Sequence, residues 1–211
     1  MPRRLSDAPP SFPRPRPNPA IAFRALLGCL GLLLAAATSA EEVKEAPGDA
    51  VPESVPEAVS ERAHELLGPF KKELLGALTD ALYEGGPENA ITVCRMEAPA
   101  IAAGSTGEGI EIGRTSHRLR NPDNAPAEWM KPLLAAYLED PERAEPRAVR
   151  LEEGRVGYVE PMRVLPMCLA CHGTDLAAPV SERLAELYPE DKATGFEAGD
   201  FRGMFWVTLP E

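Results

Sequence analysis

The feature that restricts this chain most is the five-residue motif Cys168-Leu169-Ala170-Cys171-His172. Two cysteines two residues apart, followed at once by histidine, form the attachment motif of c-type haem. The spacing matches the separation of the two haem vinyl groups, and a helical turn at the motif directs His172 at the iron. We therefore predict one covalent haem c, with thioethers at Cys168 and Cys171 and His172 as an axial ligand.

Three other interpretations of the motif compete with haem. They are a structural disulfide, a redox-active cysteine pair and half of a zinc site. A redox-active pair does not need the histidine. A zinc site needs further ligands, and only Cys94, His64 and His117 remain to supply them.

The first forty residues have the layout of a secretory signal peptide. They contain five arginines and one acid, Asp7, and an apolar run at 25–37 leads into small residues ending at Ala40. The run is shorter than the roughly 20 apolar residues that span a bilayer. We predict a signal peptide at 1–40, removed together with Cys29, and a periplasmic product without stable membrane insertion. An uncleaved N-terminal anchor is the alternative.

Charge and composition narrow the classes further. The net charge is −11, and it becomes −15 without residues 1–40. Such an excess of acid argues against nucleic-acid binding, which needs a basic face. A hydrophobic content of 44% excludes wholesale disorder. Residues 41–57 are acidic with three prolines, and we expect a flexible linker there.

Periodicity in residues 58–211 predicts a mixed domain. Apolar residues recur at helical spacing over 58–84, the pair Gly85-Gly86 ends that helix, and Pro87 begins a second one that carries Cys94. Pro99 ends or kinks the second helix. The further expected elements are strands at 109–115, 147–151, 156–162 and 204–209, a helix capped at Asn124 or its neighbours that runs through Tyr137, and a helix at 181–188. This pattern predicts an α+β fold with an antiparallel sheet, flanking helices and an N-terminal helix.

A six-coordinate haem needs a second axial ligand. Once the motif thiols are consumed, Cys94 is a lone thiol in an oxidising compartment, and ferric iron would occupy it. The alternative is a buried cysteine that acts as a small apolar residue. Met167 directly precedes Cys168, and Met162 fits the apolar core of a strand. His64 and His117 fit the surface, so Cys94 leads modestly.

Three segments resemble a family of c-haem-bearing, PAS-like sensor domains first characterised in cyanobacteria. They are Ala90–Cys94 with Ala98-Pro99; Ile112–Ser116 with Leu119–Pro122 and Asn124–Pro126; and Cys168–Gly173 with Tyr188-Pro189, Asp191–Ala193 and Gly199–Gly203. Together they span about residues 58–209. The resemblance implies a PAS-like fold, iron ligation by His172 and Cys94, and a redox- or gas-sensing role.

Arg114, Arg118 and Arg120 cluster in an otherwise acidic domain. They fit either partners of the haem propionates, which guanidinium groups bind in a bidentate way, or a solvated basic loop. Arg202 has the same two interpretations.

The functional hypothesis is an exported redox or gas sensor with His/Cys-ligated haem c, and we expect no enzyme. The alternative is a small soluble electron-transfer cytochrome, favoured because these 211 residues show no kinase, cyclase or chemotaxis module. Peroxidase chemistry ranks last, since only His64 or His117 could serve as acid–base partner. Expected partners are a redox protein or a gas ligand, with a homodimer among the hypotheses.

Overall fold

The computed structural model describes residues 55–107 and 109–211. The expected signal peptide at 1–40 and nearly all of the expected linker at 41–57 lie outside these residues. Within the described part of the chain, no helix is both long and apolar enough to cross a membrane.

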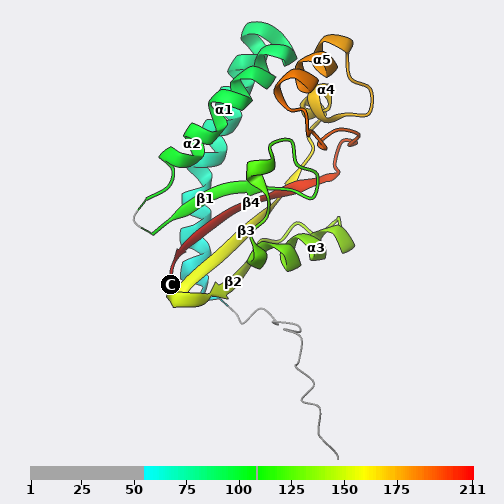
Figure 1. The fold of residues 1–211 in the computed structure, drawn as a ribbon. Helices are drawn as coiled ribbons and strands as arrows, with labels where there is room; N and C mark the ends of the chain where they lie inside the picture. The colour runs from blue at the N-terminus through cyan, green and yellow to red at the C-terminus, as the bar shows by residue number, and fades with distance from the viewer. Residues whose placement is uncertain (1–54, 108) are drawn as a thin grey trace, which may run out of the picture. The chain divides into compact units, whose positions relative to one another are not determined.

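Four antiparallel strands form one sheet in the order β1-β4-β3-β2 (Figure 1). The last strand in the sequence, β4, is therefore an inner strand of the sheet. The strands are β1 (Glu111–Thr115), β2 (Arg147–Leu151), β3 (Arg155–Arg163) and β4 (Phe201–Pro210). The α-helices are α1 (Glu57–Met96), α2 (Ala98–Gly104), α3 (Lys131–Glu139), α4 (Leu169–His172) and α5 (Ala178–Leu187). The fold is therefore α+β with an antiparallel sheet, as predicted.

The two faces of the sheet pack against different helices because alternate side chains of a strand point to opposite faces. Val156 and Tyr158 of β3 share a core with Leu67 of α1. Val159, the residue after Tyr158, points to the opposite face and shares a second core with Tyr137 of α3. The side chain of Tyr137 is fully buried in this second core.

Helix α1 is interrupted where the sequence predicted the end of its first segment. Gly85 and Gly86 depart from helical geometry, and Gly86 has a φ of +70°. That left-handed conformation is accessible at low cost only to glycine. The chain changes direction there (Figure 1), and the segment after the break buries Ala90 and Ile91.

Several predicted boundaries shift by a few residues. The strand expected from 109 begins at Glu111, the one expected from 204 begins at Phe201, and the helix expected from 181 begins at Ala178. Prolines in the first turns of α2 and α5 are tolerated because the amide they replace has no partner inside a helix. Pro99 therefore opens a short extra helix, α2, after α1 has ended.

The capping role expected around Asn124 falls to Asn121. Its side-chain oxygen accepts a hydrogen bond from the Asp123 amide at 3.2 Å, which caps a short 3-10 turn. Asn124 instead uses its backbone carbonyl, which accepts from the Thr115 hydroxyl at 2.8 Å. Helix α3 begins only at Lys131 and has no side-chain cap.

Candidate functional site

The C-x-x-C-H motif forms a tight turn shortly after β3. One turn of 3-10 helix, Pro166–Cys168, leads directly into α4. Gly173 follows because the turn closes on itself: a Cβ there would lie 2.6 Å from the carbonyl oxygen of Leu169. Cys168 and Cys171 are half-buried free thiols. The two thiols and the imidazole of His172 therefore all project from a single helical turn.

These three side chains line one cavity of about 470 Å³. Ligand sites in proteins have volumes of roughly 300–1,000 Å³. Its walls include apolar residues of α1 and of the end of β3, namely Leu74, Leu75, Leu78, Leu82, Ala90, Ile91, Pro161, Met162 and Val164. Such a cavity suits a large, mostly apolar ligand.

The charged residues that line the cavity are positive, whereas the chain as a whole is negatively charged. Five cationic residues line it: Lys71, Arg114, Arg120, Arg163 and Arg202. No aspartate or glutamate of the described residues is among its lining side chains, although the whole chain carries a net charge of −11. A ligand with negatively charged groups is therefore favoured over a neutral one.

His172 is held in a defined orientation. Its Nδ1 lies 2.6 Å from the carbonyl oxygen of Ala193. Burial, with the nearby charges of Arg120 and Arg202, lowers the pKa of His172 to about 2, so the imidazole is neutral. A neutral imidazole beside a carbonyl acceptor carries its proton on Nδ1, which leaves the Nε2 lone pair for a metal.

Cys94 lies on the second segment of α1 and lines the same cavity as His172. Ile91, three residues earlier, belongs to an apolar cluster with Leu184 of α5, and Cys171 packs against this cluster. The cluster therefore joins the helix that carries Cys94 to the motif turn. Cys94, Cys168 and Cys171, which the sequence predicts to bind one haem, therefore line the same cavity.

The charge environment of Cys94 has opposing contributions. Burial raises the pKa of its thiol, and the positive charges of Arg114 and Arg120 partly offset that increase. A soft sulfur donor and a neutral imidazole in one cavity form a suitable axial pair for haem iron. The donor set therefore fits the predicted group.

The three arginines singled out in the sequence do not share one environment. Arg114 lines the cavity, and its side chain forms no hydrogen bond or ion pair with any residue in 55–107 or 109–211. Arg120 also lines the cavity, but its donors bind Asp191 and the carbonyls of Cys171 and Ala193. Of these three arginines, Arg114 alone both lines the cavity and has a guanidinium group that binds no other described residue.

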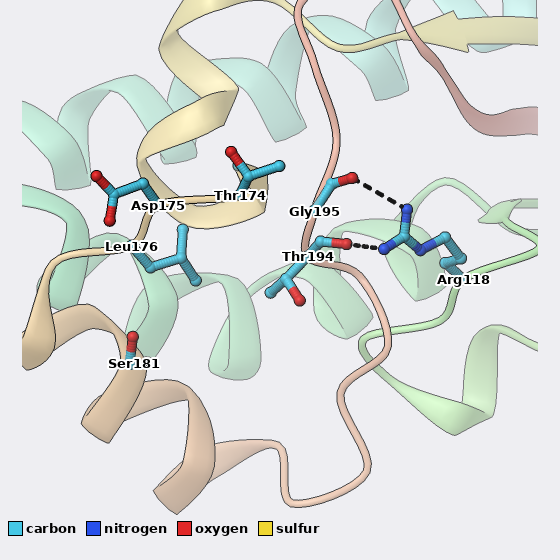
Figure 2. Close-up of a pocket in the computed structure, with 8 residues that line it drawn as sticks. Arg118, Thr174, Asp175, Leu176, Ser181, Thr194 and Gly195 are labelled. Atoms are coloured by element: carbon cyan, nitrogen blue, oxygen red, sulfur yellow. Dashed lines mark hydrogen bonds between the residues drawn. The ribbon is translucent and has the colours of Figure 1, made fainter. Parts of the chain in front are cut away.

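Arg118 does not line this cavity. It borders a second depression of about 490 Å³ together with Thr194 and Gly195, whose carbonyls accept its hydrogen bonds (Figure 2). This depression contains neither the motif thiols nor His172. We therefore assign the candidate site to the cavity at the motif turn.

The other residues considered as axial ligands fall into two groups. Met162 and Met167 line the cavity. The assignment of Met162 to the core was wrong, because it is half-buried and faces this space. His64 and His117 do not line it: His64 binds Glu160, and His117 is exposed and stacks on Phe201.

The zinc interpretation finds no support in the described part of the chain. No group of three or more histidine, cysteine, aspartate and glutamate side chains gathers there in a way that could hold a metal ion. Cys94, His64 and His117 therefore do not complete a site with the motif.

A polar cluster that the sequence did not predict lies beside the cavity. The buried carboxylate of Glu160 accepts hydrogen bonds from Lys71, His64 and Tyr158. Lys71 also lines the cavity. The sequence did contain a signal, since Glu160 is the one acid among the uncharged residues between Arg155 and Arg163 in β3.

Comparison with known proteins gives one family and one solved structure. A family model described as Tll0287-like matches residues 35–210. The structure described as that of the cyanobacterial haem protein Tll0287 superposes with a TM-score of 0.54 and 27% sequence identity, covering 75% of this chain and 98% of that chain. No curated protein matches the sequence significantly. The family match spans most of the chain, and this protein belongs to the Tll0287-like family.

Proposed function

We propose that the cavity holds one haem c, attached through Cys168 and Cys171 and ligated by His172 and Cys94. One observation carries the proposal: all four side chains line a single cavity that is apolar, cationic and free of lining acids in the described residues. The relative Tll0287 is a haem protein, which supports the same ligand. When bound, haem supplies an iron that exchanges one electron.

The motif residues have separate tasks in this proposal. Cys168 and Cys171 would each hold the haem through a thioether, the product of adding the thiol S–H across a vinyl double bond. His172 offers Nε2, because its Nδ1 is engaged by the Ala193 carbonyl. The group is held by two covalent bonds and does not depend on iron ligation alone.

Arg114 is the residue that we assign to a haem propionate. It lines the cavity, and no described residue competes for its guanidinium group. Guanidinium groups bind carboxylates through two parallel hydrogen bonds. Arg118 and Arg120 are already committed to backbone carbonyls, so we no longer propose them for this task.

We further propose that the protein is an exported, periplasmic redox or gas sensor with a PAS-like fold. Cys94 supports sensing because it sits on a helix segment separated from the rest of α1 by the Gly85-Gly86 break. A soft ligand on a separately mounted segment can leave the iron when the oxidation state or a gas ligand changes. Thiolate ligation also favours the ferric state.

Electron transfer is the second candidate function, and one observation favours it. Leu75, Leu165 and Met167 line the cavity while they are 48%, 48% and 38% exposed, respectively. The cavity therefore opens to solvent along an apolar rim. A partner could approach the redox group there without a change of iron ligands.

Haem attachment is tested first. The full chain is produced in a host that matures c-type cytochromes, and haem is stained after denaturing electrophoresis of the periplasmic and cytoplasmic fractions. We expect stain in the periplasmic fraction, and its loss when both Cys168 and Cys171 are changed to Ala. Haem that leaves the wild-type chain on denaturation contradicts covalent attachment, and stain in the cytoplasm contradicts export.

The sixth ligand and the role are tested together. Ferric and ferrous absorption spectra and the midpoint potential are compared for wild type, Cys94→Ala and the control Met162→Leu. We expect only Cys94→Ala to change the spectrum and raise the potential. Binding of CO to the ferrous wild type with loss of the Cys94 ligand supports a sensor, whereas unchanged ligation through the redox cycle supports a carrier.

A further inference from the structure

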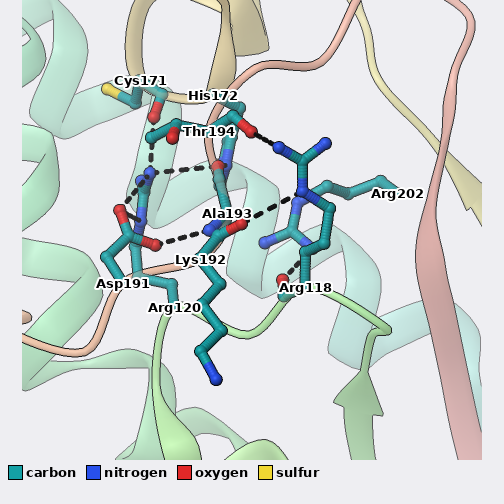
Figure 3. Close-up of polar contacts among 9 residues, drawn as sticks. All are labelled: Arg118, Arg120, Cys171, His172, Asp191, Lys192, Ala193, Thr194 and Arg202. Atoms are coloured by element: carbon teal, nitrogen blue, oxygen red, sulfur yellow. Dashed lines mark hydrogen bonds and ion pairs between the residues drawn. The ribbon is translucent and has the colours of Figure 1, made fainter.

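The hydrogen-bond partner of His172 lies on a segment without helix or strand. Ala193 belongs to residues 191–196, which form no regular secondary structure. Backbone hydrogen bonds hold both ends of this segment, since the amides of Lys192, Gly195 and Phe196 donate to the carbonyls of Leu119, Gly173 and His172, respectively. Ala193, whose carbonyl accepts the hydrogen bond from Nδ1 of His172, lies between these anchors, and Figure 3 shows arginine side chains converging on it.

Arg120 contacts both the residue before His172 and the Ala193 carbonyl to which His172 is hydrogen-bonded. One of its terminal nitrogens donates to the carbonyl of Cys171 and, at 3.4 Å, to that of Ala193. Its Nε lies 3.2 Å from the carboxylate of Asp191, whose other oxygen accepts the Ala193 amide at 2.8 Å. Arg120 thus connects the motif turn with the segment that holds its histidine.

Arg118 binds the residues on either side of Ala193. It donates to the carbonyls of Lys192 at 3.1 Å, Thr194 and Gly195 at 3.3 Å. Its guanidinium carbon lies 4.3 Å from the ring centroid of Phe196, a favourable cation–π distance. Two arginines therefore add side-chain contacts along most of the 191–196 segment to the backbone hydrogen bonds at its ends.

We propose that Arg118 and Arg120 are positioning residues for His172, an inference that rests on the proposed haem function. They hold the Ala193 carbonyl where it accepts a hydrogen bond from the Nδ1–H group. A firm hydrogen bond at Nδ1 increases the donor strength of the opposite nitrogen. The two arginines thereby strengthen His172 as an iron ligand and stabilise the ferric state, although neither touches the iron.

Charge must be separated from geometry to test this proposal. Removal of an arginine charge near iron favours the ferric state, whereas a loosened His172 disfavours it, so the two effects oppose each other. Lysine keeps the charge but lacks the planar fork that binds several carbonyls at once. Arg118→Lys and Arg120→Lys therefore isolate the positioning effect.

Arg155→Lys is the matched control. Arg155 also donates to a backbone carbonyl, that of Gly109 at 3.2 Å, and to the Thr208 hydroxyl. It lies at the start of β3, whereas the motif turn follows the end of that strand. Its substitution perturbs a comparable set of contacts away from the 191–196 segment.

The first measurement is the midpoint potential of the haem-loaded proteins. We expect each Lys variant at 118 and 120 to destabilise the ferric state about tenfold relative to the ferrous state. For a one-electron couple, tenfold raises the potential by about 59 mV. We expect Arg155→Lys to leave the potential unchanged. Potentials for Arg118→Lys and Arg120→Lys that equal the wild-type value overturn the proposal.

The second measurement is exchange of the His172 Nδ1 proton with solvent, followed by NMR on histidine-labelled ferrous protein. We expect about tenfold faster exchange in the two Lys variants and wild-type exchange in Arg155→Lys. If one of the two Lys variants fails to fold, the other variant still tests the positioning role. A wild-type protein without covalent haem rejects the proposed function itself, whereas a haem-loaded protein insensitive to both Lys variants rejects only the positioning role.

Discussion

The buried carboxylate of Glu160 makes a quantitative prediction possible. Its side chain is 11% exposed and binds Lys71, whose side chain is 28% exposed. His64 is its second hydrogen-bond partner, with Nδ1 at 2.7 Å from the carboxylate. Lys71→Met removes one partner and leaves the carboxylate in place, whereas Glu160→Gln removes the buried charge itself.

Loss of one partner from a buried ion pair costs about 3–5 kcal/mol of stability. We expect about 2–3 kcal/mol for Lys71→Met, because solvent reaches Lys71 and His64 remains. Glu160→Gln should cost about 2 kcal/mol, the value of hydrogen bonds to a charged group. The double variant should lose less than the sum, because no carboxylate is left buried without its partner.

The pH dependence has a defined sign. Burial alone raises the pKa of Glu160, but hydrogen bonds and positive charge from Lys71 and His64 outweigh it, so the pKa lies below the ordinary value of 4.5. A carboxyl with a lowered pKa stabilises the fold above its unfolded pKa and loses that contribution as the pH falls through its folded pKa. The difference between wild type and Glu160→Gln should therefore be full at pH 7 and shrink below about pH 4.5.

Urea denaturation followed by circular dichroism measures these free energies at pH 7 and at acidic pH. Lys131→Met is the control, since Lys131 forms an exposed pair with Glu128 that is worth about 0–1 kcal/mol. Equal losses for Lys71→Met and Lys131→Met, or strict additivity in the double variant, would refute the assignment of Glu160 as a buried charge.

Three further substitutions test the fold by the same denaturation assay. Leu67→Ala should cost about 2–5 kcal/mol because Leu67 is fully buried, and a smaller loss would contradict the packing of α1 on the sheet. Gly86→Ala should cost about 1–2 kcal/mol at its positive φ, whereas the control Gly76→Ala, with open space around it in α1, should gain about 0.5–1 kcal/mol. Gly157→Ala should cost about 1–3 kcal/mol, since its Cβ would lie 2.6 Å from the Trp129 ring, and wild-type stability would contradict that contact.

Local features of the chain were the predictable part of this fold. The break at Gly85-Gly86 follows from a backbone preference that the residues themselves carry, and the four strands follow from alternation and turn residues. The surroundings of side chains near strand ends were harder to predict. Alternation distinguishes two faces but does not say which face borders a cavity, and Met162 was misassigned for that reason.

The arginine contacts could not be predicted from the sequence. Arg118 and Arg120 bind backbone carbonyls more than fifty residues further along the chain. A carbonyl acceptor exists at every residue, so no composition or spacing identifies the one that is used. Arg114 was grouped with them because it is near in sequence, and only the tertiary structure separates it from the other two.

The central position of β4 has a consequence for how the cavity is completed during folding. β1 and β3 meet only through β4, which consists of residues 201–210. Until β4 docks, the sheet lacks its middle and the cavity lacks Arg202 and Phe205. A chain in which β4 has not docked therefore leaves the cavity, and the thiols of Cys168 and Cys171 that line it, open on that side.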